Sequence, residues 1–226
     1  MISVTPTITH IAGPALLLVT IILVASKHLR LPITVRGVLL LPAGCLIFIP
    51  INDLPIAIYI RGLLGDLSIT TLILLFTASM SALLDRNFYT PRSFFLIMLP
   101  ALTVGLFLYP FSLGFTDFDP YALGYSSKTF LAFFFAAALT AWYFNLYFLV
   151  IIIVLDISAY LMGIYESRNI WDYLIDPILT LFAFFWLIIW MIKRVVQYLS
   201  SRRQTHNVVE KARPPRDRWV PTDLTH

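Results

Sequence analysis

The chain alternates long apolar runs with short charged connections, and this alternation restricts its fold more than any other feature does. A helix that crosses the roughly 30 Å hydrocarbon core of a bilayer needs about 20 mainly apolar residues. Seven runs are interpreted as such spans, at residues 8–26, 36–51, 67–84, 94–112, 129–144, 147–165 and 175–192. We therefore expect an all-α fold, a polytopic transmembrane helical bundle of about seven spans.

The composition indicates that lipid is the main solvent of the chain. Of the 226 residues, 59% are hydrophobic and 12% are charged, and the mean hydropathy is +0.85. A water-soluble domain of this size cannot bury that many apolar side chains. The formal charge of +4 does not indicate nucleic-acid binding, because the basic residues collect at the ends of the runs and in the last 34 residues. The expected partner is the lipid bilayer.

Lys and Arg are divided unevenly between the two sides of this bundle. Thirteen of the sixteen lie on one side, five in loops and eight after residue 192, whereas the other side holds Arg61, Lys128 and Arg168. Because cationic side chains resist translocation, the richer side is expected to be cytoplasmic. This places the amino terminus outside and the carboxyl-terminal tail in the cytoplasm, and the location that we expect is a bacterial inner membrane.

The first run is expected to remain in the protein as a span. Residues 1–7 contain no Lys or Arg, whereas a secretory signal peptide opens with a positive region. The cationic flank of the run, from Lys27 to Arg36, follows it. That order also predicts an outer amino terminus.

Residues 129–165 allow two interpretations. Asp156 is their only charged residue, and as one helix these residues would be about 55 Å long, nearly twice the thickness of the hydrocarbon core. We therefore predict a helical hairpin with its turn near Asn145. The alternative is one unbroken helix and six spans, which would move the eight basic residues of the tail to the outer side.

The connection at residues 51–68 is too apolar to lie in water and too short to cross the membrane. It is predicted to be a short helix in the interface or a re-entrant segment buried by its neighbours. Pro55 suits the first turn of such a helix, with Asn52 or Asp53 as its N-cap.

Four polar residues of this connection form a candidate binding site: Asn52, Asp53, Arg61 and Asp66. Arg61 lies five residues before Asp66 and eight after Asp53, so a turn of the chain would bring it within reach of a carboxylate. One interpretation is a structural cap and an ion pair. The other is a binding site on the outer face.

Most carboxylates of the chain collect on the outer side, in three separate connections: Asp53, Asp66, Asp117, Asp119, Glu166, Asp172 and Asp176. They either occupy loops that Lys and Arg avoid or form a vestibule that attracts cations.

Asp156 is the one carboxylate inside an expected span. As the tenth residue of the run that begins at Tyr147, it lies near the midplane, where a charge costs roughly 2.5 to 3.5 kcal/mol. It is expected to face protein or water, and desolvation favours its uncharged form. Proton or cation coupling is one interpretation. The other is a structural hydrogen bond to the polar stripe of the third span, formed by Thr70, Thr77 and Ser81.

No motif for catalysis or cofactor binding is found in the sequence. The four His residues lie at the ends of runs or in the tail, and Cys45 is the only cysteine. Neither haem held between helices nor a zinc site is therefore expected. Walker A, dinucleotide-binding and nucleophile-elbow motifs are also missing. We expect no metal and no cofactor, and we assign no catalytic residue.

The chain is expected to divide into a transmembrane helical domain, 1–192, and a basic cytoplasmic tail, 193–226, largely disordered. Three functional classes remain open. The preferred one is a non-enzymatic accessory or assembly subunit of an envelope complex, with other membrane subunits as partners. The second is a small transporter or channel that uses Asp156 and the outer carboxylates. The third is a lipid- or glycan-modifying enzyme with its site at Asp53, Arg61 and Asp66.

Overall fold

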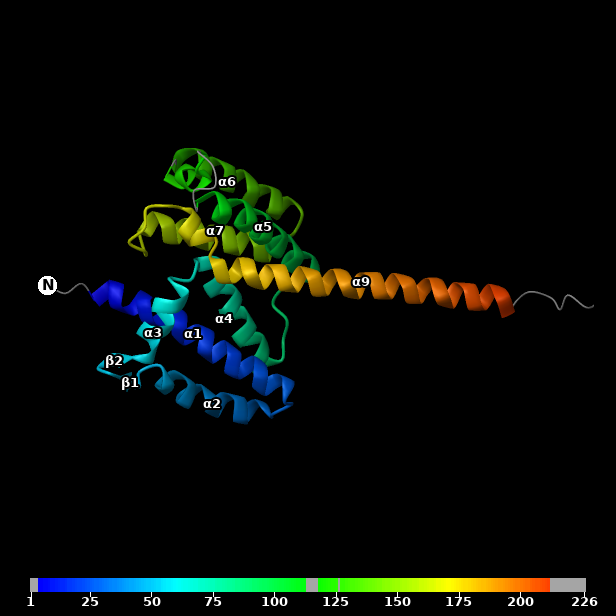
Figure 1. Cartoon of the computed structure of the whole chain (residues 1–226), viewed down its shortest axis with the longest axis horizontal. Helices are drawn as coiled ribbons and strands as arrows, with labels where there is room; N and C mark the ends of the chain where they lie inside the picture. Colours follow the sequence, from blue (N-terminus) through cyan, green and yellow to red (C-terminus); the bar gives the residue numbers. More distant parts are fainter. Residues whose placement is uncertain (1–3, 113–117, 126, 212–226) are drawn as a thin grey trace, which may run out of the picture. The chain divides into compact units, whose positions relative to one another are not determined.

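The computed structural model describes residues 4–112, 118–125 and 127–211, and these are almost entirely helical (Figure 1). The predicted all-α class is confirmed. The α-helices are α1 (Val4–His28), α2 (Ile33–Leu46), α3 (Ile56–Leu64), α4 (Ile69–Leu84), α5 (Pro91–Pro110), α6 (Ser127–Tyr143), α7 (Tyr147–Met162), α8 (Trp171–Leu174) and α9 (Pro177–Lys211). The remaining elements are a 3₁₀ helix, η2 (Pro120–Tyr125), and two short strands, β1 (Pro50–Ile51) and β2 (Leu54–Pro55).

Three of these helices are long and apolar enough to cross a membrane, which is fewer than the seven expected. They cover Ile11–His28, Pro91–Pro110 and Pro177–Arg202. Four further apolar helices are shorter: Ile33–Leu46, Ile69–Leu84, Lys128–Tyr143 and Tyr147–Met162. At about 1.5 Å per residue, a helix of the length of α4 rises about 24 Å and so falls short of the roughly 30 Å core.

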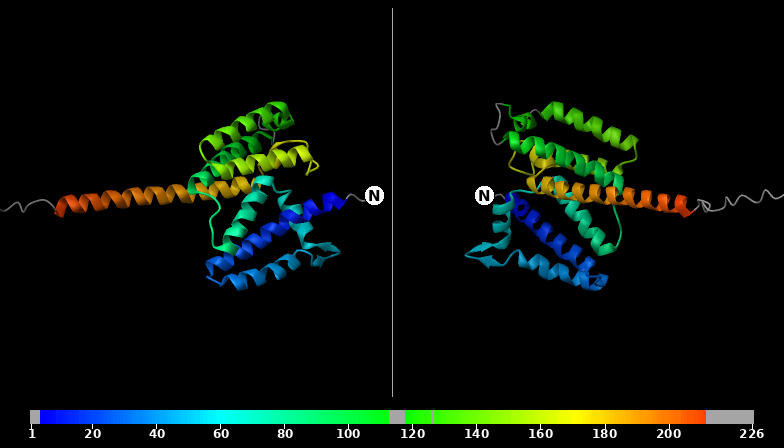
Figure 2. Two further views of the ribbon diagram at one scale, coloured as in Figure 1. Left: turned by 180° about the vertical axis from the view of Figure 1, so that it is seen from behind. Right: turned by 45° about the vertical axis from the view of Figure 1, so that its right-hand side comes forward.

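The described chain forms two compact units, residues 1–184 and 185–226. In the first unit, α1 packs against α2, α3 and α4, and it runs between α2 and α4 in both views of Figure 2. α5 and α6 each pack against α7, and α7 in turn packs against α4. The first turn of α4 is thereby close to α7 and α8.

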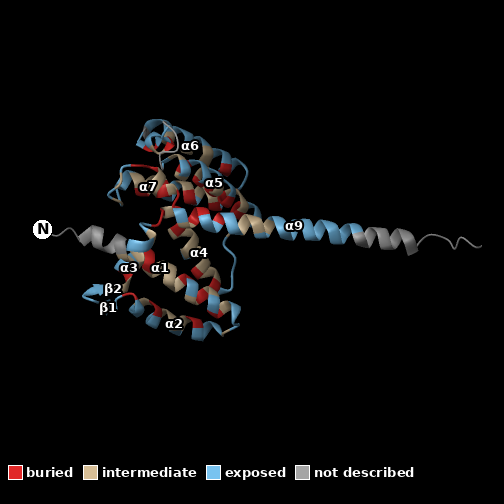
Figure 3. Cartoon of the chain, in the orientation of Figure 1, coloured by how far each residue is buried: buried red, intermediate tan, exposed pale blue. Residues whose placement is uncertain are grey.

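Burial follows the inner faces of these helices (Figure 3). Leu23, Ile47, Met98 and Leu108 are almost completely buried, whereas many large apolar side chains on other faces are exposed, among them Phe133 at 63%. Exposed apolar surface of this extent is unusual for a soluble protein. It is the surface expected of helices whose solvent is lipid.

The predicted hairpin near Asn145 is confirmed. α6 ends at Tyr143, α7 begins at Tyr147, and Asn145 adopts left-handed backbone with φ 58°. Its N–H donates to the Trp142 carbonyl at 2.9 Å, and the Leu146 N–H donates to the Ala141 carbonyl at 2.9 Å. This pair of bonds is a Schellman motif, which ends a helix with Gly or Asn in the left-handed position. The turn therefore needs no Gly or Pro.

The connection at residues 51–68 contains the predicted short helix, α3, but its expected cap is wrong. The N-cap is Pro55, and no side chain caps the helix. Asn52 and Asp53 instead form a two-residue turn between β1 and β2, with φ of 48° and 66°. Two left-handed residues are the mark of a type I′ hairpin turn, for which Asn and Asp are suited. The expected span 36–51 is correspondingly shorter, since α2 ends at Leu46.

The last helix continues beyond the expected end of its span at residue 192, as far as Lys211. Within the second unit, the Arg194 guanidinium lies 5.3 Å from the centre of the Trp190 ring, and that of Arg202 lies 5.2 Å from the Tyr198 ring. The rest of the tail that was expected to be largely disordered, residues 212–226, falls outside the described residues.

Candidate functional site

Two buried carboxyl groups lie at the first turn of α4, and their surroundings differ. Asp176 precedes α9 and is 3% exposed, and Asp156 on α7 is 1% exposed. Both accept hydrogen bonds from side chains of residues 68–71. The two carboxyl groups differ in the number of hydrogen-bond donors around them.

Asp176 is surrounded by donors from two helix starts. Its Oδ2 accepts the Ser68 N–H at 2.9 Å, the Ser68 hydroxyl at 2.7 Å and the Thr71 hydroxyl at 2.5 Å. Its Oδ1 accepts the Leu179 N–H at 2.7 Å. Ser68 is the N-cap of α4, so one carboxylate stabilises the amino-terminal ends of α4 and α9 together, where helix dipoles favour negative charge.

Asp156 has a single donor. Its Oδ2 accepts the Thr70 hydroxyl at 2.7 Å, and its Oδ1 has no hydrogen-bond partner among the described residues. The expected hydrogen bond to the polar stripe of α4 is confirmed for Thr70 only. The Thr77 hydroxyl donates to carbonyls of its own helix, and the Ser81 hydroxyl is buried without a partner in the described chain.

A cavity of about 270 Å³ adjoins Asp156. Its walls come from the middle turns of α5, α6 and α7, including Ala101, Phe134 and Ile152, and Trp171 of α8 also lines it. Among its lining residues Asp156 is the only charged one. A mainly apolar cavity with one polar group aimed into it has the chemical character of a small-molecule site.

Trp171 is held in place by η2 and by the loop that joins α7 to α8. Its indole N–H donates to the Pro120 carbonyl at 3.2 Å, and its backbone N–H donates to Asn169 Oδ1 at 3.0 Å. Gly124 lies so close to Asn169 and Trp171 that a Cβ there would collide with both. The buried amide of Asn169 thus fixes one wall of the cavity.

Asp172, one of the carboxylates expected on the outer side, also contacts η2. Both of its oxygens accept the Tyr121 hydroxyl at 2.8 Å. Burial raises the pKa of Tyr121, and the hydrogen bond to Asp172 raises it further. Tyr121 therefore stays a neutral donor, and this carboxylate joins α8 to η2.

The four residues predicted as an outer site have two local roles. The Arg61 guanidinium donates to Asp66 through two bonds of 2.6 and 3.0 Å, and this hydrogen bond is the main cause that raises the pKa of Arg61. Asn52 and Asp53 are the exposed turn of the β1–β2 hairpin. The predicted ion pair is confirmed, and binding by these four residues stays a prediction.

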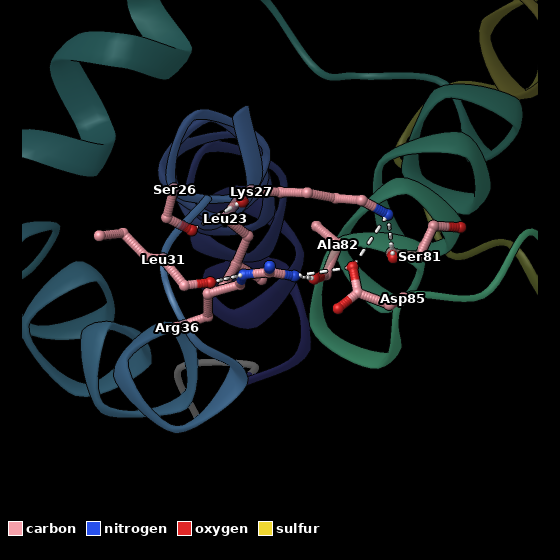
Figure 4. A network of polar contacts seen from close by, with 8 residues as sticks. All are labelled: Leu23, Ser26, Lys27, Leu31, Arg36, Ser81, Ala82 and Asp85. Atoms are coloured by element: carbon pink, nitrogen blue, oxygen red, sulfur yellow. Dashed lines mark hydrogen bonds and ion pairs between the residues drawn. The ribbon is translucent and has the colours of Figure 1, made fainter. Parts of the chain in front are cut away.

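A second polar cluster joins α1, α2 and α4 (Figure 4). It lies at the carboxyl-terminal ends of α1 and α4 and at the start of α2. Arg36 of α2 is buried and donates to the carbonyls of Leu31 and Ala82 at 2.8 and 2.7 Å. It also pairs with Asp85 at 2.9 Å, and Lys27 of α1 lies 3.3 Å from the same carboxylate. The hydrogen bond from Arg36, with a further one from Lys27, holds the pKa of Asp85 below its ordinary value.

Sequence reasoning included Asp176 only as one of seven outer carboxylates and missed its role. The pair Asp176–Pro177 contains the signal, because Asp is a preferred N-cap and Pro a preferred first helical residue. Arg36 was likewise grouped with the exposed loop charges. No local pattern marks it as buried, since two of its partners, Ala82 and Asp85, lie 46 and 49 residues away.

No group of three or more His, Cys, Asp and Glu side chains in the described part of the chain could hold a metal ion. No protein-family model matches the chain, and neither does a curated protein or a solved structure. The function of the chain is therefore inferred from the geometry of the two carboxyl groups and of the cavity.

Proposed function

We propose that the chain is a multi-pass protein of a bacterial inner membrane, a small transporter in which Asp156 exchanges a proton for a cationic ligand. The observation that carries this proposal is Asp156 Oδ1, a buried carboxyl oxygen without a partner among the described residues. An unsatisfied polar atom costs free energy in the folded state. Intramembrane carboxyl groups kept at such a cost serve as ion or proton sites in many transporters.

Seven spans remain the proposed topology, with the amino terminus outside. The cluster of Lys27, Arg36 and Asp85 supports it, because it joins the end of α1, the start of α2 and the end of α4. Three consecutive spans that alternate in direction would have these ends on one side. A helix shorter than the hydrocarbon core can still span it where the bilayer is locally thinner or where the residues next to the helix are buried in protein. Reporters fused at Met1 and after His226 are expected on opposite sides, and the same side for both would refute this topology.

The transport proposal is tested in proteoliposomes of the full chain with an imposed pH gradient. Addition of alkali or organic cations is expected to dissipate the gradient with the wild-type protein. Asp156→Asn keeps the size and hydrogen-bonding capacity of the side chain but cannot titrate, so its vesicles are expected to hold the gradient like empty ones. Glu210→Gln, a matched change at a carboxylate of the carboxyl-terminal tail, is expected to behave as wild type. Equal dissipation by Asp156→Asn would refute the proposal.

An accessory subunit is the second candidate, and the second unit of the chain favours it. Past residue 192 the helix carries basic residues next to exposed Val195, Val196 and Leu199. Apolar side chains on a charged helix suit the surface of a partner protein. In mild detergent the wild-type chain would then co-purify with a stoichiometric membrane subunit, and Val196→Asp with Leu199→Asp would lose it. A chain that purifies alone from native membranes would exclude this candidate.

A further inference from the structure

The cavity beside Asp156 lies between α5 and α6, with α7 behind it. Its lining runs along the middle turns of these helices, from Leu96 to Val104 on α5 and from Phe133 to Ala137 on α6. Phe133 and Pro100, one from each wall, are both exposed on the surface of the unit. The mouth of the cavity therefore opens sideways between two helices, towards the bilayer if these helices span it.

The polar chemistry of the cavity is simple. The lining residues supply one carboxyl group, Asp156, and one hydroxyl, Thr70, which already donates to it. The indole N–H of Trp171 is bound to the Pro120 carbonyl. What remains for a ligand is Asp156 Oδ1, a buried acceptor without a partner among the described residues. The aromatic rings of Phe133, Phe134 and Trp171 line the same cavity.

This arrangement does not suit a dehydrated metal ion, because such ions need about six oxygen ligands. An ammonium group needs fewer contacts. Its N–H can donate to Asp156 Oδ1, its charge compensates the carboxylate, and aromatic faces attract cations. The rest of the wall is apolar and requires an apolar ligand body.

The volume limits the size of that body. The cavity of about 270 Å³ lies just below the roughly 300 to 1,000 Å³ of ordinary ligand pockets, so only a small ligand fits. That corresponds to a short alkyl or small ring system that carries one amine.

We propose that this cavity binds a small lipophilic ammonium ion that enters from the membrane between α5 and α6 and displaces one proton from Asp156. The inference rests on the proposed transport function and names its substrate class.

The exchange balances in charge and atoms. In the empty cavity the carboxyl group is neutral, because no cation among the lining residues compensates a negative charge. When the ammonium ion binds, the O–H bond of Asp156 breaks, the proton leaves to water, and the carboxylate pairs with the bound cation. One positive charge enters and one leaves.

Other titratable groups belong to the elements packed around α7, but none of them lines the cavity. They include Tyr89 before α5, Arg92 and Tyr109 on α5, Lys128 and Tyr143 on α6, Tyr147 and Tyr160 on α7, Tyr165 after α7, Asp172 and Tyr173 on α8, Asp85 after α4 and Asp176 before α9. Asp176 and Asp172 are each engaged by hydroxyl donors. The proton released on binding is therefore assigned to Asp156.

Binding is tested by calorimetry on the full chain in detergent, with n-octylammonium as the probe and detergent alone as the blank. Measurements in two buffers of different ionisation enthalpy give the number of protons released. We expect one proton for each ligand bound near neutral pH. 1-Octanol, which has a hydrogen-bond donor but no charge, is expected to bind more weakly and to release none.

Two variants separate the carboxyl group from the cavity. Asp156→Asn is expected to weaken octylammonium binding by about tenfold to a hundredfold, the loss of one charged hydrogen bond, and to abolish proton release. Ala137→Leu fills the cavity from α6 and leaves Asp156 intact, so it is expected to weaken both octylammonium and octanol. Glu210→Gln, in the carboxyl-terminal tail, is the matched control and is expected to bind as wild type. Thermal unfolding of each variant shows that it is folded.

Each result decides the assignment. Equal binding of octanol and octylammonium, binding without proton release, or unchanged affinity of Asp156→Asn would overturn it. If octylammonium fails to bind while alkali cations still dissipate the pH gradient through Asp156, the proposed ligand class is refuted and the transport function is retained. If octylammonium binds and releases a proton but no pH gradient is dissipated, the binding site is retained and the transport function is refuted.

Discussion

Asp156 and Asp176 are carboxyl groups of similar burial beside the same turn of α4, yet one has a single hydrogen-bond donor and the other has four. The donors of Asp176 include two backbone N–H groups at helix starts, which need an acceptor in any folded state. Asp156 lies in the middle of α7 and accepts one hydrogen bond, from Thr70 of α4, so fewer groups of the fold depend on it. Burial is thus similar for the two carboxyl groups, and the number of donors is the difference on which their proposed roles rest.

The largest expected effect is that of Asp176→Ala. It removes the acceptor of the Thr71 hydroxyl and of the N–H groups at the start of α4 and α9, at about 1 to 3 kcal/mol for each buried group that stays unsatisfied. The Ser68 hydroxyl keeps Thr71 Oγ1 as an acceptor at 3.0 Å. We expect a loss of about 4 kcal/mol, large for one substitution, seen as a strong fall of the unfolding midpoint in detergent. A midpoint within a few degrees of wild type would mean that Asp176 is not the joint between these helices.

Gly105→Ala is expected to disturb the surroundings of Asp176 by a smaller amount. A Cβ at Gly105 would collide with the side chain of Thr180, whose hydroxyl donates to the Asp176 carbonyl at 3.1 Å. Overpacking of this kind costs about 2 kcal/mol. The control is Gly44→Ala in α2, where a Cβ meets open space and a gain of roughly 0.5 kcal/mol is expected from helix propensity. Equal stabilities of the two variants would contradict the close approach of α5 and α9.

Asp156→Leu tests the other carboxyl group. Replacing a carboxyl group that has one unsatisfied oxygen by an apolar side chain of suitable size is neutral or stabilising. With a cavity beside it to take the larger side chain, the variant is expected to lie within about 1 kcal/mol of wild type, or above it, while proton release on ligand binding is lost. Destabilisation as large as that of Asp176→Ala would assign Asp156 a structural role.

The smallest effect concerns Asp85, an exposed carboxylate whose pKa lies below its ordinary value of 3.8 because of Arg36 and Lys27. A lowered pKa in the folded state means that the pair stabilises the protein above the ordinary pKa and that this contribution is lost as pH falls through the lowered value. The unfolding midpoint of wild type is thus expected to fall below about pH 4 more steeply than that of Asp85→Asn. Parallel pH profiles would show that the pair contributes nothing.

Sequence reasoning succeeded where length or chemistry left few choices. The turn at Asn145 followed from the thickness of the bilayer, and Thr70 as the partner of Asp156 followed from the need of a buried carboxyl group for a hydroxyl on a neighbouring helix. Pairing of Arg61 with Asp66 followed from their spacing of five residues.

Failures arose where tertiary contacts overrule local preference. Asn52 and Asp53 are good N-caps and equally good turn residues, and the pairing of β1 with β2 decided between these roles. Arg36 is indistinguishable in sequence from an exposed loop residue, and the carbonyl of Ala82 that binds its guanidinium comes from another helix. The cavity beside Asp156 could not be found either, because its walls come from helices far apart in the sequence.

The buried position of Arg36 also has a consequence for biogenesis. Its carboxylate partner, Asp85, is synthesised 49 residues later, which at about 5 to 20 residues per second is a delay of roughly 2 to 10 s. During that interval the guanidinium has neither its counter-ion nor the Ala82 carbonyl. If α2 spans the membrane as proposed above, we therefore expect it to stay at the lipid headgroups, with its charge hydrated, until the chain as far as Asp85 has left the ribosome.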